Sequence, residues 1–442
     1  MSWRSLIAGV FASLFCCFTD HQIIYPIAAE IAADLNFPKS DCGVLASSYS
    51  LFTGLSAFFL APFTDTLGRV WFIRWAGLTF FFSLLLCGMA PNYDVLLISR
   101  CLNGVAAGPL ISCLFALPGD EVPVEHLDKA YGVAGSTFGA ATVIGISVST
   151  WATATMGWRS AFFILVAIYF PAWLFLATRS YKVWEPQKIV IREQVSSITT
   201  LFKRRDLVPL ILAPFMGNWA VYSSQAYFGV FFQVNMGVSI NILIVIMFFA
   251  GIATIAGSLM MPYLTLVAKR VSIVSFGFLG GCLMYPFYYT LGSVSSLKWF
   301  TIIFFIAIWW VLGVGYAAIT AHISIESSED ERGRMLSFQS VFTSLGISLG
   351  AFWPSFFIEE DAYGKLQHLD LISGAAIIPA LGMWYLLWLA EDMKLRIKEE
   401  ADRKIAEEKE RHRLEEEAER QRIIMEKRRK IEEEERRGYR RL

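Results

Sequence analysis

Long apolar segments recur through most of this chain, and they constrain its fold more than any other feature. A helix needs about 20 consecutive apolar residues to cross the hydrocarbon core of a bilayer. About twelve such segments lie near residues 6–30, 42–63, 72–90, 95–118, 130–154, 159–178, 207–232, 240–267, 272–292, 299–325, 334–358 and 369–391. We therefore expect an all-α membrane protein with twelve transmembrane helices, the first of them a retained span and not a cleaved signal peptide.

The charges are concentrated at one end of the sequence. Residues 392–442 hold 18 of the 38 Lys and Arg and 16 of the 38 Asp and Glu, which leaves few charges for the preceding 391 positions. A soluble protein of that size could not cover its surface with so few, so membrane lipid is the expected environment. The formal net charge of zero gives no indication of a nucleic-acid partner.

Basic residues are distributed unequally between the two sets of loops. If the N-terminus is inside, the inner segments before residue 392 hold 15 Lys and Arg, and the outer loops hold only 4, namely Lys39, Arg159, Lys298 and Lys365. Short cytoplasmic loops collect Lys and Arg. We therefore expect a multi-pass protein of the plasma (inner) membrane with both termini in the cytoplasm.

A polar stretch at 179–206 divides the apolar segments into two sets of six. The predicted organisation is an N-terminal six-helix half (1–178), a cytoplasmic linker (179–206), a C-terminal six-helix half (207–391) and a charged helical tail (392–442). Weak internal similarity supports two parallel halves, since Pro62 with Gly68–Val70 corresponds to Pro262 with Lys269–Val271. Chance similarity between apolar helices is the alternative.

Four short motifs, in order, carry a family resemblance. APFTDTLGRVWF at Ala61–Phe72 joins the second and third segments, and LLISRCLNGVAAG at Leu96–Gly108 lies in the fourth. GWRSAFF at Gly157–Phe163 begins the sixth, and ERG at Glu331–Gly333 precedes the eleventh. Together they resemble the major facilitator superfamily of secondary transporters. The resemblance implies two six-helix halves around a central cavity.

The first motif contains the candidate gating residues. Asp65, Gly68 and Arg69 match the superfamily's signature loop, which in the family holds the two halves together in one state. Glycine permits a tight turn, and the carboxylate can accept hydrogen bonds from a helix N-terminus or pair with a cation. The alternative is an ordinary charged turn at the membrane surface.

The fifth segment departs from one branch of that family. Drug:proton antiporters usually carry Pro in a GPxxGG motif, whereas Gly135–Gly145 reads GSTFGAATVIG, with Ala140 where Pro would be expected. The spaced glycines should still let helices approach closely. The resemblance therefore leaves the antiporter branch open.

Charged residues within the apolar segments are the candidates for proton coupling. Asp20 and His21 lie about mid-membrane in the first segment, and Arg100 lies in the fourth. A charge in the bilayer costs roughly 2.5–3.5 kcal/mol on insertion scales, so Asp20 and Arg100 are expected to pair. Such a pair could couple transport to a proton or could only order the helices. His21 points about 100° away from Asp20 and could face the cavity or a neighbouring helix.

The seventh segment supplies candidate substrate contacts. Asn218, Tyr222 and Gln225 step by four and three residues, so they share one helix face. In the family this segment borders the central cavity, and packing between helices is the competing interpretation. His322, one turn before Glu326 in the tenth segment, is a further cavity candidate, with ordinary solvation near the cytoplasm as its alternative.

The charged tail and the cysteines give no sign of a catalytic or metal site. Glu precedes Lys or Arg by four at seven positions in the tail, which favours a solvated helix over a stable coiled coil. Its basic end could touch anionic lipid. The seven Cys lack paired CxxC spacing and are expected to be packing residues.

These observations predict secondary active transport of a small molecule or ion by alternating access, coupled to protons. The rival hypothesis is a transporter-like scaffold or sensor that recruits a protein partner through the tail. No P-loop, HExxH motif or nucleophile elbow is present, so we expect no catalytic residues, no bound metal and no cofactor.

Overall fold

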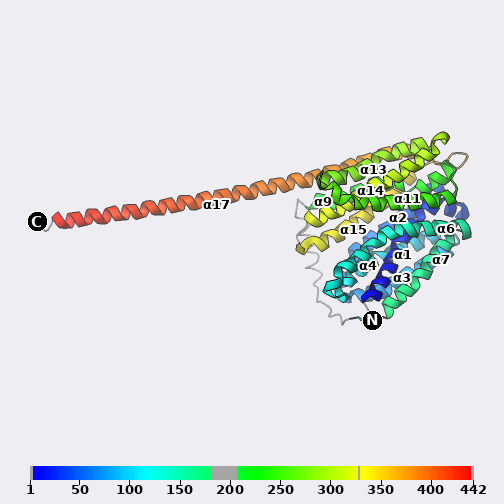
Figure 1. Ribbon diagram of the computed structural model, residues 1–442, viewed down its shortest axis with the longest axis horizontal. Helices are drawn as coiled ribbons and strands as arrows, with labels where there is room; N and C mark the ends of the chain where they lie inside the picture. Colours follow the sequence, from blue (N-terminus) through cyan, green and yellow to red (C-terminus); the bar gives the residue numbers. More distant parts are fainter. Residues whose placement is uncertain (1–2, 182–206, 327–328, 440–442) are drawn as a thin grey trace. The chain divides into compact units, whose positions relative to one another are not determined.

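The computed structural model describes residues 3–181, 207–326 and 329–439. The chain divides into a compact bundle, Met1–Trp388, and a second unit, Leu389–Leu442. Figure 1 shows that the bundle consists of long helices that run roughly alongside one another. Because a helix satisfies its backbone hydrogen bonds internally, this is the architecture that the apolar segments require in lipid.

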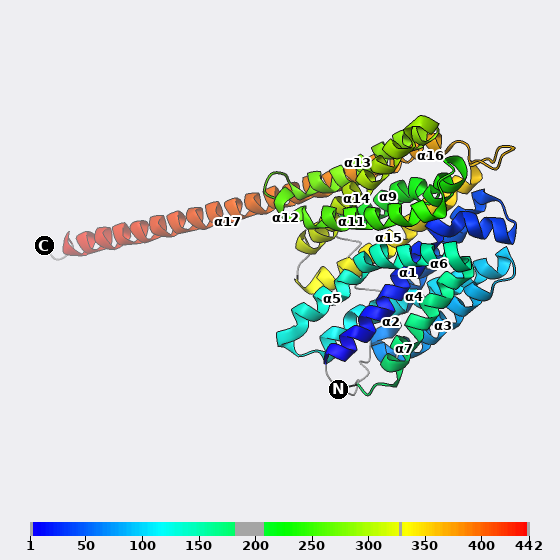
Figure 2. The ribbon, with the colours of Figure 1, turned by 45° about the vertical axis from the view of Figure 1, so that its right-hand side comes forward.

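The first half of the bundle provides six passages, grouped together in Figure 2. The passages and their connecting turns are α1 (Trp3–Leu35), η1 (Lys39–Asp41), α2 (Cys42–Leu67), α3 (Arg69–Met89), α4 (Tyr93–Glu121), η2 (Val124–His126), α5 (Leu127–Ala140) with η3 (Ala141–Gly145) and α6 (Ile146–Met156), and α7 (Trp158–Thr178).

The second half provides the other six passages. They are α9 (Val208–Gln225) with α10 (Phe228–Val230) and η4 (Phe231–Asn235), α11 (Ile240–Leu259) with α12 (Met261–Leu264), α13 (Arg270–Gly292), η5 (Ser295–Leu297), α14 (Lys298–Glu326), α15 (Glu329–Phe352) with η6 (Trp353–Phe356), and α16 (Leu369–Ala375) with the start of α17 (Ile377–Tyr439). The expected all-α fold with two six-helix halves is confirmed.

The expected seventh span differs from the others. Within the described residues, eleven helices are long and apolar enough to cross a membrane, and the passage that begins with α9 is not among them. This passage is interrupted at Ala226 and Tyr227, between α9 and α10. Its polar face, with Asn218, Tyr222 and Gln225, lowers the mean hydropathy of α9.

The connection between the second and third passages is shorter than the expected loop. α2 runs to Leu67 and α3 begins at Arg69, so Gly68 alone separates them. Gly68 has φ 87° and ψ 143°, a conformation that residues with a β-carbon rarely adopt. The turn therefore depends on this glycine.

Contacts between helices join the two halves inside the described bundle. α2 packs along α15, α6 packs against α11, and α1 packs against α10. At the last contact, a β-carbon on Gly229 would collide with the carbonyl oxygen of Tyr25. The absence of a side chain at Gly229 thus lets the two backbones approach closely.

The spaced glycines of the fifth passage serve this purpose only in part. A β-carbon on Gly145 would collide with the side chain of Thr19 in α1, so Gly145 permits a close approach there. Gly135 has nothing within 4 Å of its β-carbon position. The π-helical turn Ala141–Gly145 ends at the second of these glycines in the chain, and it contacts α1 and α11.

The second unit is a single described helix, the continuation of α17 to Tyr439. Ion pairs one turn apart run along it, among them Asp392–Arg396 at 2.8 Å and Glu426–Lys430 at 3.2 Å. Such pairs stabilise a helix by about 0.2–0.5 kcal/mol each. Two of the seven pairs that the sequence predicts, Glu432 with Arg436 and Glu433 with Arg437, have side chains outside the described part of the chain.

Candidate functional site

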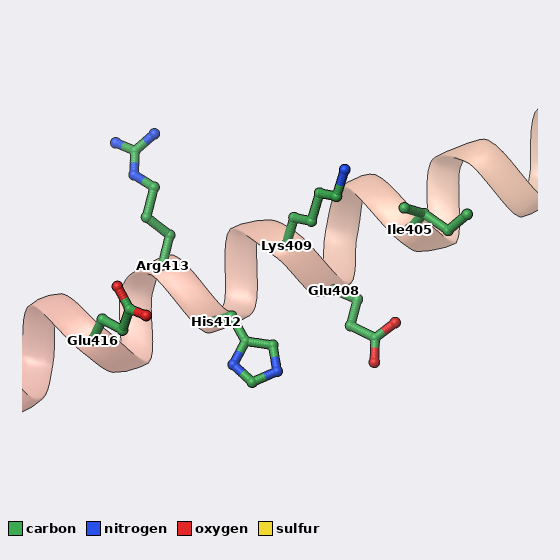
Figure 3. Close-up of a pocket in the computed structure, with 6 residues that line it drawn as sticks. All are labelled: Ile405, Glu408, Lys409, His412, Arg413 and Glu416. Carbon is green, nitrogen blue, oxygen red and sulfur yellow. The ribbon is translucent and has the colours of Figure 1, made fainter.

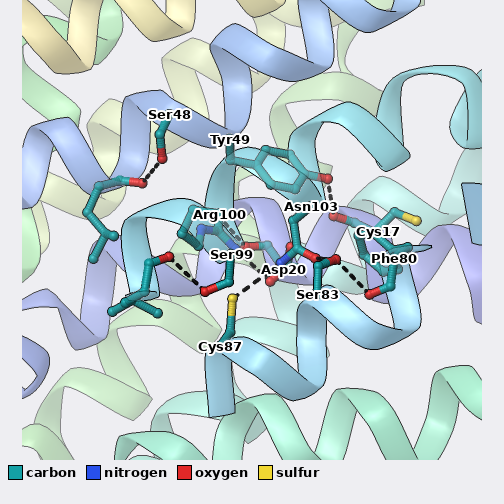
Figure 4. Close-up of polar contacts among 12 residues, drawn as sticks. Cys17, Asp20, Ser48, Tyr49, Phe80, Ser83, Cys87, Ser99, Arg100 and Asn103 are labelled. Carbon is teal, nitrogen blue, oxygen red and sulfur yellow. Dashed lines mark hydrogen bonds and ion pairs between the residues drawn. The ribbon is translucent and has the colours of Figure 1, made fainter. Parts of the chain in front are cut away.

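A buried ion pair lies at the centre of the first half. Arg100 on α4 donates from Nη1 to Oδ1 of Asp20 on α1 at 2.6 Å, and both side chains are 0% exposed. Arg100 Nη2 donates to the backbone carbonyl of Asp20 at 3.0 Å, and the guanidinium carbon lies 4.7 Å from the ring centre of Tyr49 (Figure 4). The structure therefore brings together the two charges that the sequence predicts to pair.

A hydrogen-bond network holds α4, and with it Arg100, against α3. Asn103 lies one turn after Arg100, accepts a hydrogen bond from the hydroxyl of Ser83, and donates to Sγ of Cys87 at 3.5 Å (Figure 4). All three side chains are buried. Interhelical hydrogen bonds in membranes contribute about 0.6 kcal/mol on average, so this network positions Arg100 with modest stabilisation.

His21 connects the ion-pair region to the second half. Its Nε2 lies 3.0 Å from Oγ of Ser50 on α2. The His21 ring centre lies 5.3 Å from that of Tyr49, 6.2 Å from Tyr25, and 6.4 Å from Tyr222 on α9. His21 thus contacts the neighbouring helix α2, one of the two orientations that the sequence left open, and also a ring of the opposite half.

The predicted polar face of α9 is buried. Asn218 donates to the carbonyl of Pro214 at 2.7 Å and accepts a hydrogen bond from the hydroxyl of Tyr316 on α14 at 3.1 Å. The rings of Tyr222 and Tyr25 lie 5.7 Å apart, across the boundary between the halves. Gln225 is 5% exposed, and its Oε1 has no hydrogen-bond partner within the described part of the chain.

His322 is also on α14, six residues after Tyr316. Its side chain is 6% exposed, whereas Glu326, one turn later, is half-buried. The structure therefore does not place His322 in the solvated environment that was the alternative interpretation. We assign no role to His322.

The signature turn carries an ion pair that the sequence did not predict. Arg69 donates from Nη1 to both carboxylate oxygens of Asp120, at 2.5 and 2.6 Å, and so ties the start of α3 to the end of α4. Both residues belong to the first half. Asp65 lies in α2, one turn before Gly68, and its side chain is outside the described residues.

Polar contacts also join the halves at the bundle end that holds η1. Nζ of Lys39 lies 3.0 Å from Oε2 of Glu360, and the Lys39 backbone N–H donates to the same carboxylate at 2.5 Å. The Tyr227 hydroxyl donates to the carbonyl of Ser40 at 2.8 Å, and Gln233 donates to the carbonyl of Pro26 at 2.8 Å. Sequence reasoning missed these contacts because their partners are far apart in the chain.

A groove on the second unit does not form a comparable site. The side chains in Figure 3, from Ile405 to Glu416, all come from one helix, so no second element provides an opposing wall. Among the described residues, no group of three or more His, Cys, Asp or Glu could hold a metal ion. The buried residues around the Asp20–Arg100 pair are therefore the strongest candidate site.

The fold and this site define a multi-pass helical membrane protein, with two packed halves and a charged pair inside one of them. The sequence model of the Major Facilitator Superfamily matches residues 10–351. The chain belongs to this superfamily. This family is one of transporters and not generally of enzymes.

Individual relatives are distant. An uncharacterized MFS-type transporter of Mycobacterium tuberculosis is 30% identical over 189 residues, which cover 43% of this chain and 27% of that protein. The chain thus matches about a quarter of that relative's length. The MFS-type transporter YwfA of Bacillus subtilis is 23% identical over 354 residues, covering 78% and 83% of the two chains.

The solved structure of a D-xylose–proton symporter superposes with a TM-score of 0.67. The match covers 87% of this chain and 98% of the symporter at 13% sequence identity. At that identity the likeness concerns the fold alone.

Proposed function

We propose that this protein transports a small solute by alternating access and couples the movement to protons through Asp20. The observation that carries the proposal is the Asp20–Arg100 pair, fully buried in the membrane-spanning bundle and in contact with the second half through Tyr49, His21 and Tyr222. A buried charge pair is costly to keep unless it has a structural or functional role.

The geometry suggests how a proton would change this site. Protonation of Asp20 removes its negative charge and with it the main attraction for Arg100. The guanidinium keeps other partners, since Nη2 already bonds the Asp20 carbonyl and the Tyr49 ring lies beneath it. A protonated and an unprotonated arrangement are thus both accommodated, as a coupled cycle requires.

The signature turn would then hold the first half together as it moves. Gly68 is the single residue between α2 and α3, and Arg69 ties α3 to α4. Because α2 also packs along α15 of the other half, a stiff connection would transmit movement between the halves. In this role Asp65, Gly68 and Arg69 act on the conformational equilibrium and not on the solute.

Proton flux tests the proposal. The purified protein is reconstituted in liposomes that contain a pH-sensitive dye, and solutes are added one at a time. A transported solute should change the internal pH, and Asp20→Asn should abolish this change while leaving solute exchange measurable. Asp370→Asn, the same substitution at an exposed position, is the matched control. Undiminished proton flux in Asp20→Asn would reject the coupling role.

The proposed location is the plasma membrane, with both termini in the cytoplasm, for which the unequal distribution of basic residues is the support. Reporters fused after Arg205 and after Leu442 should both be cytoplasmic, and one inserted near Lys365 should be external. An external reporter at Leu442 would contradict the charge argument.

A further inference from the structure

The rings of His21, Tyr25, Tyr49 and Tyr222, which we name the seam site, meet where the two halves of the bundle touch. They come from α1, α2 and α9. The centre of the His21 ring lies 5.3 to 6.4 Å from the three tyrosine rings, and Tyr25 and Tyr222 lie 5.7 Å apart. The seam site therefore includes side chains from both halves, next to the Asp20–Arg100 pair.

We infer that the seam site recognises a planar ring of a solute that carries no net charge. This inference rests on the proposed transport function and adds the chemical class of the solute. It combines three properties of the site: aromatic faces from both halves, compensated charge, and buried polar atoms without a protein partner.

The aromatic contacts cross the boundary that alternating access must open. His21 and Tyr25 belong to the first half, and Tyr222 belongs to the second. When the halves separate there, these rings no longer pack against one another. A planar ring that enters between them restores offset or edge-to-face aromatic contact on both sides.

While Asp20 is ionised, as in the ion pair of the structure, the charges near the seam site compensate one another. Among the described residues, Asp20, Arg100 and His322 are the buried side chains of ionisable acidic or basic type. Asp20 and Arg100 form an ion pair with each other. A solute with a net charge would enter this region without a dedicated counter-charge, and desolvating an unpaired ion is costly. A solute without net charge avoids that cost.

Polar atoms near the rings provide hydrogen-bonding capacity for such a solute. Asp20 Oδ2, Arg100 Nε, the Tyr25 hydroxyl and Gln225 Oε1 are buried and have no hydrogen-bond partner within the described parts of the chain. Leaving such groups unpaired is unfavourable. Hydroxyl or amide groups on the solute could satisfy both the donors and the acceptors.

A set of matched compounds tests the inference on the unaltered full-length protein in lipid nanodiscs at pH 7. The probes are 4-hydroxyphenylacetamide (neutral), tyramine (cationic), 4-hydroxyphenylacetate (anionic) and cyclohexylacetamide (neutral, without an aromatic plane). Binding is measured as the concentration-dependent rise in melting temperature, since a ligand of the folded state stabilises it by mass action. The neutral aromatic amide should bind at least about tenfold more tightly than each of the others.

Each other outcome overturns the inference. Stronger binding of tyramine or of 4-hydroxyphenylacetate would reject the requirement for neutrality. Equal binding of cyclohexylacetamide would reject the recognition of a planar ring. Binding by none of the four would reject the solute class, while the proton-flux measurement would still decide separately whether the protein transports anything.

Two substitutions then place the binding at the seam site. Tyr222→Leu should weaken binding of the neutral amide at least about tenfold, and Tyr222→Phe, which keeps the ring, should retain most of it. Tyr385→Leu, at an exposed tyrosine, is the control. If the Tyr222→Leu protein folds and binds the neutral amide as tightly as the unaltered protein, the ligand binds outside the seam site and the inference is wrong. If Tyr222→Leu fails to fold, the four-compound comparison still decides the class.

Discussion

The two halves of the bundle hold their central polar side chains in different ways. In the first half, Asp20 and Arg100 form an ion pair whose side chains are fully buried. In the second half, Asn218 and Tyr316 form a neutral hydrogen bond, and the Tyr222 ring packs across the boundary. The difference is that the first half has an ion pair at its centre, whereas the described α9 face has uncharged polar groups.

The largest expected effect comes from removing one charge of the buried pair. Arg100→Met should lower the free energy of unfolding by about 3–5 kcal/mol, because it leaves the Asp20 carboxylate buried without its cation. Thermal unfolding in nanodiscs, followed by tryptophan fluorescence, measures the loss. The double variant Asp20→Asn with Arg100→Met should recover a large part of the lost stability, since it leaves no unpaired charge at this site.

Arg159→Met is the matched control for that substitution. Arg159 pairs with Asp34, but these side chains are 37% and 48% exposed. Exposed ion pairs contribute about 0–1 kcal/mol. If Arg159→Met and Arg100→Met lower the free energy of unfolding equally, burial does not make the Asp20–Arg100 pair more important for stability than an exposed pair.

A smaller effect is expected from the neutral pair of the second half. Tyr316→Phe keeps the ring but leaves Oδ1 of Asn218 without its donor, which should cost about 1–3 kcal/mol. Tyr263→Phe, at a tyrosine that is 70% exposed, should change stability little and serves as the control. A loss as large as that of Arg100→Met would remove the energetic contrast between the halves.

The sequence was sufficient for the fold because membrane insertion imposes simple requirements. The length and order of the apolar segments predict the helices, and the polar stretch at 179–206 predicts the division into two halves. The pairing of Asp20 with Arg100 was also predictable, since two charges in the hydrocarbon region need partners. The ends of helices were less predictable, because α1 and α4 extend beyond their apolar segments with polar residues such as Asp34 and Glu121.

Contacts between distant segments were not predictable. Tyr49 and Ser50 complete the surroundings of His21 and Arg100, but nothing distinguishes them from the many other tyrosines and serines of a chain met alone. Lys39 contacts Glu360 only because the fold brings two loops together. The break at Ala226 and Tyr227 was likewise not predictable, because neither position is a proline or a glycine.

The Lys39–Glu360 pair sharpens the comparison where the halves meet. Its side chains are 23% and 26% exposed, so Lys39→Ala should lower the free energy of unfolding by only about 0–1 kcal/mol. Because the pair joins the halves at the η1 end, the same change should favour conformations that are open there. A cysteine at Ser40 should then react faster with a water-soluble maleimide.

Reversal of both charges is the control for the Lys39 prediction. Lys39→Glu alone should speed labelling at position 40, since it places two carboxylates together. Lys39→Glu combined with Glu360→Lys should restore slow labelling. Fast labelling in the double variant would mean that the side-chain attraction does not hold this end closed.

The smallest expected effect concerns Asp361, next to Glu360 in the exposed turn before α16. The backbone N–H groups of Lys365 and Tyr363 and the amide of Gln367 donate to its carboxylate, and these bonds hold the pKa of Asp361 below its usual value of 3.8. A lowered pKa means that the ionised form supports the folded turn. Its contribution is therefore complete at pH 7, and is lost as the pH falls below 3.8 through the lower, folded-state pKa.

Asp361→Asn at pH 7 should reproduce part of this loss. Hydrogen exchange at the Tyr363 and Lys365 amides should become several-fold faster, and the melting temperature should not change measurably. If exchange at these amides stays unchanged, the turn is held by its backbone alone, through Gly364 at φ 71° and the Glu360–Leu366 bridge, and the Lys39–Glu360 contact is then independent of Asp361.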